Sequence, residues 1–488
     1  MKIFIISILG FLFCTQHMVA QNEFDALRYS NLEFYGDARF NAMGGSFGAL
    51  GANMSSLSIN PAGIGVYKSS DISFTPAFHY NYTDTKLDGN SLTDGKLNFH
   101  FSNIGVVGNL PGSGNWESVS FGIGYNRTSN FNNSISAKGK TDWSMLNKYT
   151  TELNVGEGTI GDEIEQLYPF SSNLAYQNYL VNPTIADTLK YDHVFQNSVN
   201  LTQTTNYEAR GGSGEVFFTF GGNYNDKLFL GATMGIPTVR YIYDRNYSET
   251  SDVNDTLTDF KSFVLHDYVK TTGAGVNFKL GMIYKLTDWV RIGMAFHTPS
   301  IIGLTDSYQT TMKSELKNGT TYDFSSPFGN YSYILTTPYR FISSIAFVAG
   351  EYGVINADYE LVDYATARLK HDNSDVEFYD FSSENQNIRN NFQITQNIRI
   401  GTEWRLDPFR LRAGYRFQGD PLKNSFSVNQ NANIYSFGFG IKQDDYYFDM
   451  AYALKMYSSQ TILVAENNDF ASTDLKDHYI TFTLGFRF

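Results

Sequence analysis

The 488-residue sequence predicts an all-β protein, a transmembrane antiparallel β-barrel of about 14 strands, and three observations support this class. The chain ends in a strand-like alternation that places Phe482, Leu484, Phe486 and Phe488 on one face, as expected where one face meets lipid. No apolar run after residue 20 approaches the ~20 residues that a membrane helix needs. The 40 Phe, 34 Tyr and 42 Gly would also suit a secreted β-sandwich or propeller, but repeated alternation over ~10 residues favours the barrel.

The first 20 residues predict a secretory signal peptide. Lys2 supplies a positive charge, residues 3–13 are almost wholly apolar, and Ala20 is a small residue at the expected cleavage point. A lipoprotein signal would use Cys14, but Phe13 is bulkier than the residue that usually precedes a lipidated cysteine. We therefore expect export and cleavage after residue 20.

Charge and cysteine content exclude several kinds of chemistry. Cys14 is the only cysteine, so the mature chain has neither a disulfide nor a thiolate site. The formal net charge of −13 argues against a nucleic-acid partner, because such a surface repels phosphate backbones. We expect no cofactor and no metal: the acidic segment 244–255 lacks the Gly and the final Glu of an EF-hand loop, and it is interpreted as a solvated loop.

The barrel is expected at residues 71–488. Fourteen segments alternate in the required way, at about residues 71–82, 97–108, 117–128, 213–224, 227–238, 271–285, 288–299, 338–349, 352–363, 394–405, 408–419, 432–442, 445–456 and 477–488. Short connections between them alternate with long ones, which is the pattern of periplasmic turns and outer loops, and an even strand number returns the C-terminus to the periplasm.

Particular barrel residues carry further expectations. Arg410, Arg412 and Arg416 share one face of a strand and should face the lumen, since arginine toward lipid is costly. Phe488 is the expected assembly signal, read by the barrel-assembly machinery of the outer membrane. The longest outer loop, 129–212, is too apolar for a disordered segment. Its candidates for capture of an apolar ligand are Trp143, Leu146, Leu167, Tyr168 and Phe170.

Residues 21–70, between the signal and the first strand, are rich in small residues and contain Asn60-Pro61-Ala62-Gly63. Pro61 fixes its own φ and favours an extended Asn60, while Gly63 permits close backbone approach, so the motif suits a compact turn. An ordinary turn leading into the first strand is the alternative. Small residues followed by this motif before the first strand resemble the FadL-type family of hydrophobic-compound transporters, which includes toluene and xylene channels.

The resemblance implies a function and a location. In that family the N-terminal segment plugs a fourteen-stranded barrel, so residues 21–70 are expected to form a plug or hatch in the lumen. It further implies passive uptake of hydrophobic small molecules, such as long-chain fatty acids or aromatic hydrocarbons, across the outer membrane of a Gram-negative bacterium. Outer-membrane lipid, lipopolysaccharide and the apolar ligand would be its partners. Many relatives carry an acidic residue a few positions before this motif, where the chain has Asn53-Met54-Ser55-Ser56, so the role of that acid is in doubt here.

An enzyme is not expected. Ser46 lies in a G-x-S-x-G pattern, but no buried strand and helix are predicted around it, as a nucleophile elbow requires. The histidines are scattered, so they predict no catalytic cluster. Haem uptake through a single histidine remains an alternative. A general porin is disfavoured by the plug and the apolar outer loop. A FadL-like barrel that serves in protein secretion or protein interaction also remains an alternative.

Overall fold

The computed structural model describes residues 22–33, 35–195, 200–252, 258–374, 378–423, 430–464 and 469–488. The predicted signal peptide, with Cys14, lies outside the described residues, and so does Gln21 at the start of the predicted plug. No helix in the described part of the chain is long and apolar enough to cross a bilayer.

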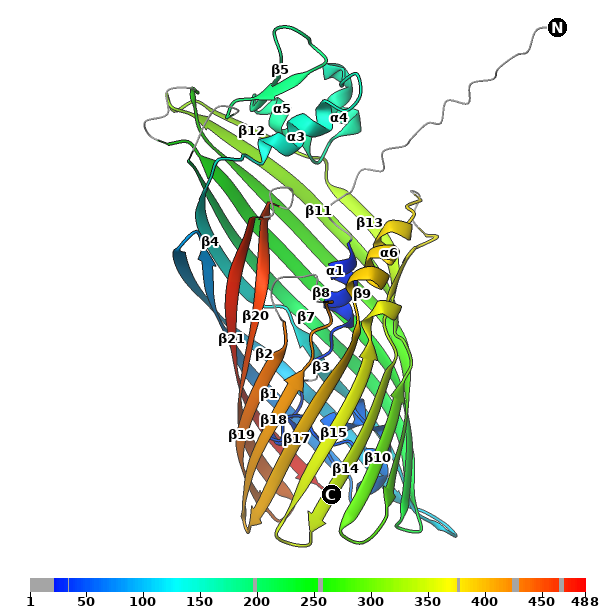
Figure 1. Ribbon diagram of the computed structural model, residues 1–488. Coiled ribbons are helices and arrows are strands. Elements are labelled where there is room, and N and C mark those ends of the chain that lie inside the picture. Colours follow the sequence, from blue (N-terminus) through cyan, green and yellow to red (C-terminus); the bar gives the residue numbers. More distant parts are fainter. Residues whose placement is uncertain are drawn as a thin grey trace, which may run out of the picture.

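Within the described segments, fourteen antiparallel strands close into a barrel (Figure 1). The first strand pairs with the last, from Asp71 opposite Arg487 to Lys86 opposite Ser472, so the sheet has no free edge along this seam. The wall strands are β1 (Asp71–Leu87), β2 (Asn90–Pro111), β3 (Trp116–Asn130), β7 (Leu201–Tyr224), β8 (Leu228–Thr250), β9 (Phe260–Lys285), β10 (Val290–His297), β14 (Arg340–Ala349), β15 (Gly353–Asp363), β17 (Ile394–Leu406), β18 (Phe409–Gln418), β19 (Ala432–Gln443), β20 (Tyr446–Val464) and β21 (Asp469–Arg487). The predicted fold class is confirmed.

Several strands run further than the sequence predicts. Residues 239–270 and 300–337 are two of the long connections between predicted strands, but β8 continues to Thr250, β9 begins at Phe260, and further strands fill the second segment. Beyond the lipid the outward face of a strand meets water and carries polar residues, so the apolar alternation that marks a lipid-facing strand is lost although the backbone pairing continues. The acidic loop predicted at 244–255 is therefore strand as far as Thr250.

Shorter strands extend the wall at the end with the long connections, which we call the loop end. The opposite end, with short turns, is the turn end (Figure 1). The chain leaves β10 at Pro299 and rejoins the wall in β11, and a similar break at Pro338 separates β13 from β14. The extensions are β4 (Asn133–Thr141), β11 (Ile301–Leu316), β12 (Thr321–Ser325), β13 (Gly329–Thr336) and β16 (Arg368–His371), with η4 (Tyr364–Thr366) and α6 (Ser382–Asn391) beside them.

The N-terminal segment lies inside the barrel, as the blue elements of Figure 1 show. The elements in its described residues are short helices, α1 (Glu23–Ser30), α2 (Ala38–Ala42), η1 (Ser55–Ser58) and η2 (Pro61–Val66). Asn22 caps α1 by accepting hydrogen bonds from the backbone N–H groups of Phe24 and Asp25. We call the described residues 22–70 the plug.

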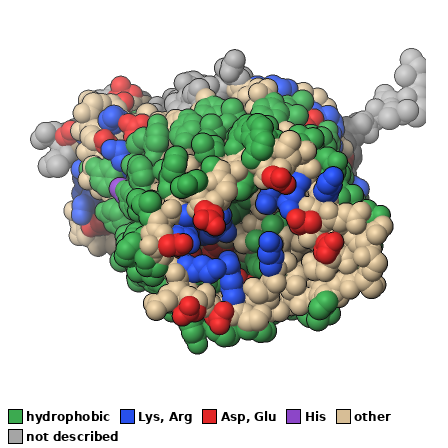
Figure 2. Space-filling model, turned by 90° about the horizontal axis from the view of Figure 1, so that it is seen from below, with side chains coloured by type: hydrophobic (Ala, Val, Ile, Leu, Met, Phe, Trp, Pro, Cys, Tyr) green, Lys and Arg blue, Asp and Glu red, His purple; other side chains and the backbone are tan. Residues whose placement is uncertain are grey.

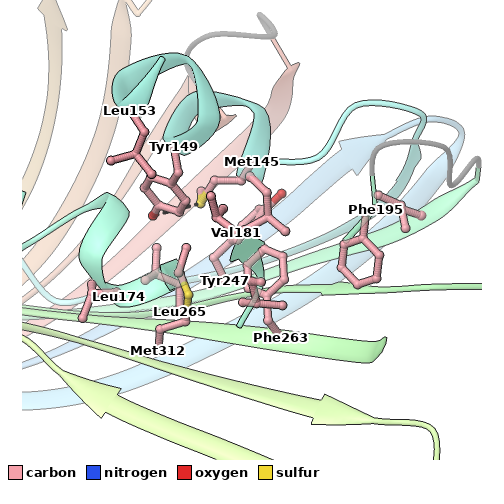
Figure 3. Packing of buried hydrophobic residues seen from close by; sticks show 14 of the residues in the cluster. Met145, Tyr149, Leu153, Leu174, Val181, Phe195, Tyr247, Phe263, Leu265 and Met312 are labelled. Carbon is pink, nitrogen blue, oxygen red and sulfur yellow. Dashed lines mark hydrogen bonds between the residues drawn. The ribbon is translucent and has the colours of Figure 1, made fainter. Parts of the chain in front are cut away.

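A small domain caps the loop end (Figure 1). Its elements are α3 (Leu146–Leu153), η3 (Gly161–Glu163), α4 (Ile164–Leu167), α5 (Ser172–Gln177), β5 (Val181–Pro183) and β6 (Tyr191–His193). Buried apolar side chains from these helices pack against the ends of β8, β9 and β11 through Tyr247, Phe263, Leu265 and Met312 (Figure 3). We call residues 142–195 the outer domain.

Candidate functional site

The plug is packed tightly against the barrel wall. At eight wall glycines an added Cβ would come within 3.0 Å of a plug atom, so a larger residue could not fit without a shift. These are Gly105 on β2, Gly221 on β7, Gly231 on β8, Gly281 on β9, Gly293 on β10, Gly401 on β17, Gly414 on β18 and Gly438 on β19. Because they lie on strands all around the barrel, the plug touches the wall on several sides.

The predicted NPAG element lies inside the barrel against β8 and β9. Asn60 donates from Nδ2 to the carbonyl oxygens of Gly48, at 2.7 Å, and Met282, at 3.1 Å. Its Oδ1 accepts from the Ala62 backbone N–H at 3.1 Å, which starts η2 at Pro61. Asn60, Pro61, Ala62 and Gly63 are all buried. Asn60 thus ties the turn both to the plug and to the wall.

On the other side of the lumen a double glycine turns the plug backbone. Gly44 and Gly45 have φ of +64° and +77°, a region that side-chain-bearing residues avoid. Ser46 follows, and its hydroxyl donates to the Asn356 carbonyl oxygen at 3.0 Å. Ser46 is therefore a packing residue in a plug and has no strand-to-helix elbow around it.

Buried ion pairs bind the plug to the wall. Arg39 of α2 donates to both carboxylate oxygens of Glu403 on β17, at 2.7 and 3.1 Å. Arg412 of β18 donates to Glu403 at 2.7 Å and to Asp449 of β20 at 2.6 Å. The side chains of Glu403, Arg412 and Asp449 are at most 5% exposed. Removing one member would leave an uncompensated charge, at a cost of about 3–5 kcal/mol.

A second ion-pair cluster lies nearer the loop end of the plug. Arg340 donates to Glu360 at 2.6 Å and to the carbonyl oxygen of Ser30, at the end of α1, at 2.5 Å. Arg399 is the other ion-pair partner of Glu360. Arg416 donates to the carbonyl oxygen of Glu33. Among the predicted lumenal arginines, Arg412 and Arg416 thus contact partners inside the barrel, while Arg410 pairs with Asp407 at the turn end, at 2.5 Å.

The wall ladder is interrupted between β2 and β3. β2 pairs with β1 along its length as far as Asn90, but it pairs with β3 only from Pro111 to Asn103. Beyond that point the plug backbone takes its place, since the N–H groups of Glu33 and Tyr35 donate to the carbonyl oxygens of Thr128 and Arg127 at 2.7 and 3.0 Å. The backbone carbonyl groups in this part of β3 therefore accept hydrogen bonds from a plug segment and not from the neighbouring wall strand.

The outer domain contains the predicted capture residues in different environments. Leu146 is fully buried in the domain core, so it is not accessible to a ligand in this structure. Trp143 and Tyr168 are half-buried against that core, and Phe170 packs on Tyr308 of β11 with ring centroids 5.1 Å apart. Leu167 is 46% exposed. The role of these residues in capture stays a prediction.

Phe488 closes the barrel seam at the turn end. Its backbone exchanges two hydrogen bonds with Ser70, at 3.0 and 3.1 Å, and its ring stacks on Phe486 at 5.8 Å. The side chain is 63% exposed on the outer surface. Its role as an assembly signal, and its recognition by the barrel-assembly machinery, stay predictions.

The buried histidines make structural contacts. His297 Nε2 lies 2.9 Å from the Ile59 carbonyl oxygen of the plug, and His79 Nε2 lies 3.1 Å from Asp477 Oδ1. No group of three or more His, Cys, Asp and Glu side chains in the described segments is placed to hold a metal ion. Asn53, the first residue of the stretch 53–56 in which relatives were expected to carry an acid, donates to Asp37 at 2.9 Å, so a carboxylate lies next to this stretch from another part of the plug.

Comparison with solved structures identifies the architecture. The toluene transporter TodX of Pseudomonas putida superposes with a TM-score of 0.55 at 12% identity, covering 94% of this chain and 99% of that one. A FadL homologue of Pseudomonas aeruginosa gives 0.52 at 12% identity, covering 93% and 98%. The chain has the FadL-type barrel fold. No protein-family model matches the sequence, and a search of curated proteins finds no match.

Sequence reasoning gave no role to the wall glycines that contact the plug in this FadL-type fold. The wall glycines at the plug contacts lie in the middle of predicted strands, where glycine weakens a sheet unless another backbone approaches closely. Gly281 and Gly401 interrupt otherwise regular alternation in this way. Glycines inside strands were therefore the available signal for the plug contacts.

Proposed function

We propose that this protein is an outer-membrane channel of a Gram-negative bacterium that takes up apolar small molecules, such as long-chain fatty acids or aromatic hydrocarbons, by passive diffusion. The observation that carries the proposal is the interrupted ladder between β2 and β3, where the plug backbone replaces β2 as the partner of Thr128 and Arg127. A plug that fills the lumen and also covers an interruption in the wall suits solutes that leave sideways into lipid.

The surroundings of the interruption support this path. On β2, next to the unpaired edge, Leu97, Phe99 and Phe101 are 68%, 51% and 48% exposed on the outer surface. On the lumenal side of the same strand, His100 packs on the ring of Tyr35, with centroids 6.4 Å apart. An apolar solute that passes here meets aromatic surface on both sides of the wall. Burial stabilises such a solute by about 0.8 kcal/mol for each CH₂ group.

The fold comparison supports the same class of function. TodX, which shares the fold, is described as a toluene transporter. The outer domain would collect the solute at the cell surface, with lipopolysaccharide around the loop end, and the short turns would face the periplasm. The solute would then enter the barrel, meet the plug and leave between β2 and β3. No cofactor is needed, because the solute moves down its own gradient.

The experiment that tests the proposal locks the plug to β3. Ser58 Oγ of η1 and Asn126 Nδ2 of β3 lie 2.7 Å apart, so cysteines in the double variant Ser58→Cys/Asn126→Cys are within reach of a short bis-methanethiosulfonate linker, in a chain whose only other cysteine, Cys14, is in the predicted signal. We expect uptake of radiolabelled toluene or oleate by cells to fall at least fivefold when the variant is cross-linked. Reduction should restore it.

A wall-only disulfide is the matched control. Thr219 of β7 and Thr233 of β8 have hydroxyl oxygens 2.7 Å apart, and Thr219→Cys/Thr233→Cys joins two wall strands without touching the plug. Its uptake should depend neither on oxidation nor on treatment with the linker. If the cross-linked plug variant takes up solute as fast as the reduced form, plug movement at the β2–β3 interruption is not part of transport.

A further inference from the structure

A basic patch borders the apolar band on the outer surface of the wall. Seen from the turn end, hydrophobic side chains cover much of one side of the outer wall (Figure 2). The band on β3, β7, β8 and β9 includes exposed side chains that pair across these strands, namely Ile123, Phe218, Met234 and Phe278. Toward the loop end, the same outward faces of β3 and β8 carry Arg127 and Arg240. These two cations therefore lie where the lipid-facing band ends.

A glycine brings the two arginines close together. Gly212 of β7 pairs directly with Arg240, so the Cβ positions of the two residues are ~5 Å apart on one face of the sheet. The guanidinium group of Arg127 lies over Gly212 from the other side, because a Cβ added to this glycine would collide with Arg127 Nη2. The Arg240 side chain is exposed and long enough to cross this separation. Both guanidinium groups can therefore contact one group that sits between them.

Neither arginine has a carboxylate partner among the described residues. Arg127 donates to the Gly211 carbonyl oxygen at 2.7 Å, and its buried Nε has no hydrogen-bond partner in the described part of the chain. Arg240 has neither a hydrogen bond nor an ion pair to a described residue, and the same holds for Lys270 of β9, its diagonal neighbour in the β8–β9 ladder. A buried donor without a partner is costly, so this patch is suited to receive an acceptor.

Two carboxylates lie on the same outward face further toward the loop end, and both are paired with other cations. Glu208 of β7 accepts from Lys96 at 2.5 Å. Asp244 of β8 lies 3.1 Å from His266 Nε2. Arg210 lies between the two acids, 3.5 Å from Glu208 and 4.0 Å from Asp244. These acids therefore do little to neutralise the arginines beside Gly212.

The position of the patch indicates which anion it meets. An arginine on the outer surface of a barrel is costly toward lipid, and its cost falls near the membrane interface. The anions at that interface are lipid headgroup phosphates, and the planar fork of a guanidinium matches a phosphate. We propose that Arg127 and Arg240, over Gly212, bind the phosphate of an outer-leaflet lipid, whose acyl chains rest on the apolar band. The site rests on the outer-membrane location proposed above and is independent of the solute path.

The test is native mass spectrometry of the full-length protein in a neutral detergent, titrated with lipid A and with the same lipid A after enzymatic removal of its phosphates. We expect the phosphorylated lipid to bind at least tenfold tighter. The double variant Arg127→Gln/Arg240→Gln should lose this difference. Lys227→Gln/Lys313→Gln is the matched control, because it removes two exposed cations from the β7–β8 turn and from the loop-end part of β11, away from the patch. It should bind as the parent does.

Further arms identify the source of the phosphate and guard against misfolding. Inorganic phosphate should displace lipid A only at concentrations at least tenfold higher than the lipid, and displacement at equal concentration would show a free-anion site instead of a lipid site. Arg240→Lys should keep the binding, whereas Arg240→Gln, at an exposed position, should weaken it even if the double variant loses heat-modifiable migration on gels. If lipid A without phosphate binds the parent as tightly as lipid A, or if Arg240→Gln and the double variant bind lipid A as the parent does, the patch is not a lipid-phosphate site.

Discussion

Ser58 of the plug and Asn126 of β3 are joined by a hydrogen bond of 2.7 Å at the residue where β3 loses its pairing with β2. Asn126 also accepts from Asn103, its partner on β2, at 2.6 Å. One side chain therefore connects the plug to both wall strands at the start of the interruption. Direct contacts at this point therefore link the position of the plug to the pairing of β2 with β3.

Replacing this side chain should loosen both connections. Asn126→Ala removes two buried hydrogen bonds: Asn103 keeps only its longer bond to the Tyr125 carbonyl oxygen, at 3.3 Å, as a donor, and Ser58 loses Asn126, at a cost of about 1–3 kcal/mol for a group left unsatisfied. We expect faster amide hydrogen exchange in residues 55–58 and 103–107. Asn115→Ala, at an exposed turn asparagine, should leave both segments protected as in the parent. Unchanged exchange in Asn126→Ala would mean that Asn126 does not hold the plug.

The fit of the plug at β9 makes a second prediction. An added side chain at Gly281 would collide with Asn60 and Pro61, so Gly281→Val should displace the NPAG turn and raise ion conductance in planar bilayers severalfold. Gly303→Val is the matched control, because an added Cβ there has almost open space. If both variants stay closed, the plug does not depend on contact with β9 for the seal.

The outer domain should respond to pH through Glu249, at the loop end of β8. Burial raises the pKa of the Glu249 carboxyl to about 7, although the Met145 backbone N–H and the Ser144 hydroxyl donate to it. A folded-state pKa above the unfolded value means that protonation stabilises the folded domain, and that this stability is lost as pH rises through 7. Residues 142–195 should therefore be cleaved by a protease more slowly at pH 6.5 than at pH 8.5.

A variant isolates this effect. Glu249→Gln keeps a neutral acceptor at the same place and should abolish the difference between pH 6.5 and 8.5. Burial lowers the pKa of His193 to about 4, so that histidine destabilises the folded domain only as pH falls below its unfolded value of about 6.5. The chosen range begins at that value, and the His193 effect acts in the opposite direction, so it cannot account for slower cleavage at pH 6.5. A pH dependence that persists unchanged in Glu249→Gln would assign the effect to another group.

Ligand capture by the outer domain can be separated from its stability. Leu167 is partly exposed and Leu146 is fully buried, so Leu167→Ser should weaken apolar uptake about fivefold with the domain folded, whereas Leu146→Ser should unfold it. Val155→Ser, at another exposed apolar residue of the domain, tests whether any exposed apolar surface suffices. Equal uptake by Leu167→Ser and the parent would remove Leu167 from the capture surface.

The barrel was predictable from the sequence because lipid imposes a pattern on each strand that crosses it. The alternation from Ile480 to Phe488 needs no knowledge of the partner strand. The extension of β8 beyond Val239 was not predictable, because its outward residues become polar there, while Tyr241 and Tyr247 on the inward face are buried against the plug and the outer domain. The ion pair between Arg39 and Glu403 depends on which strand the plug meets, and sequence spacing carries no information on a contact between positions so far apart.

The most direct test of the account is the conductance of the barrel with and without its plug. The parent protein in planar bilayers should show little conductance, because residues 22–70 fill the lumen and contact the wall at eight glycines. A variant that lacks residues 22–66 should give large, stable steps, since a fourteen-stranded barrel otherwise encloses a wide lumen. A parent protein that already conducts like a general porin, with no increase on deletion, would contradict the plugged channel and favour an open pore.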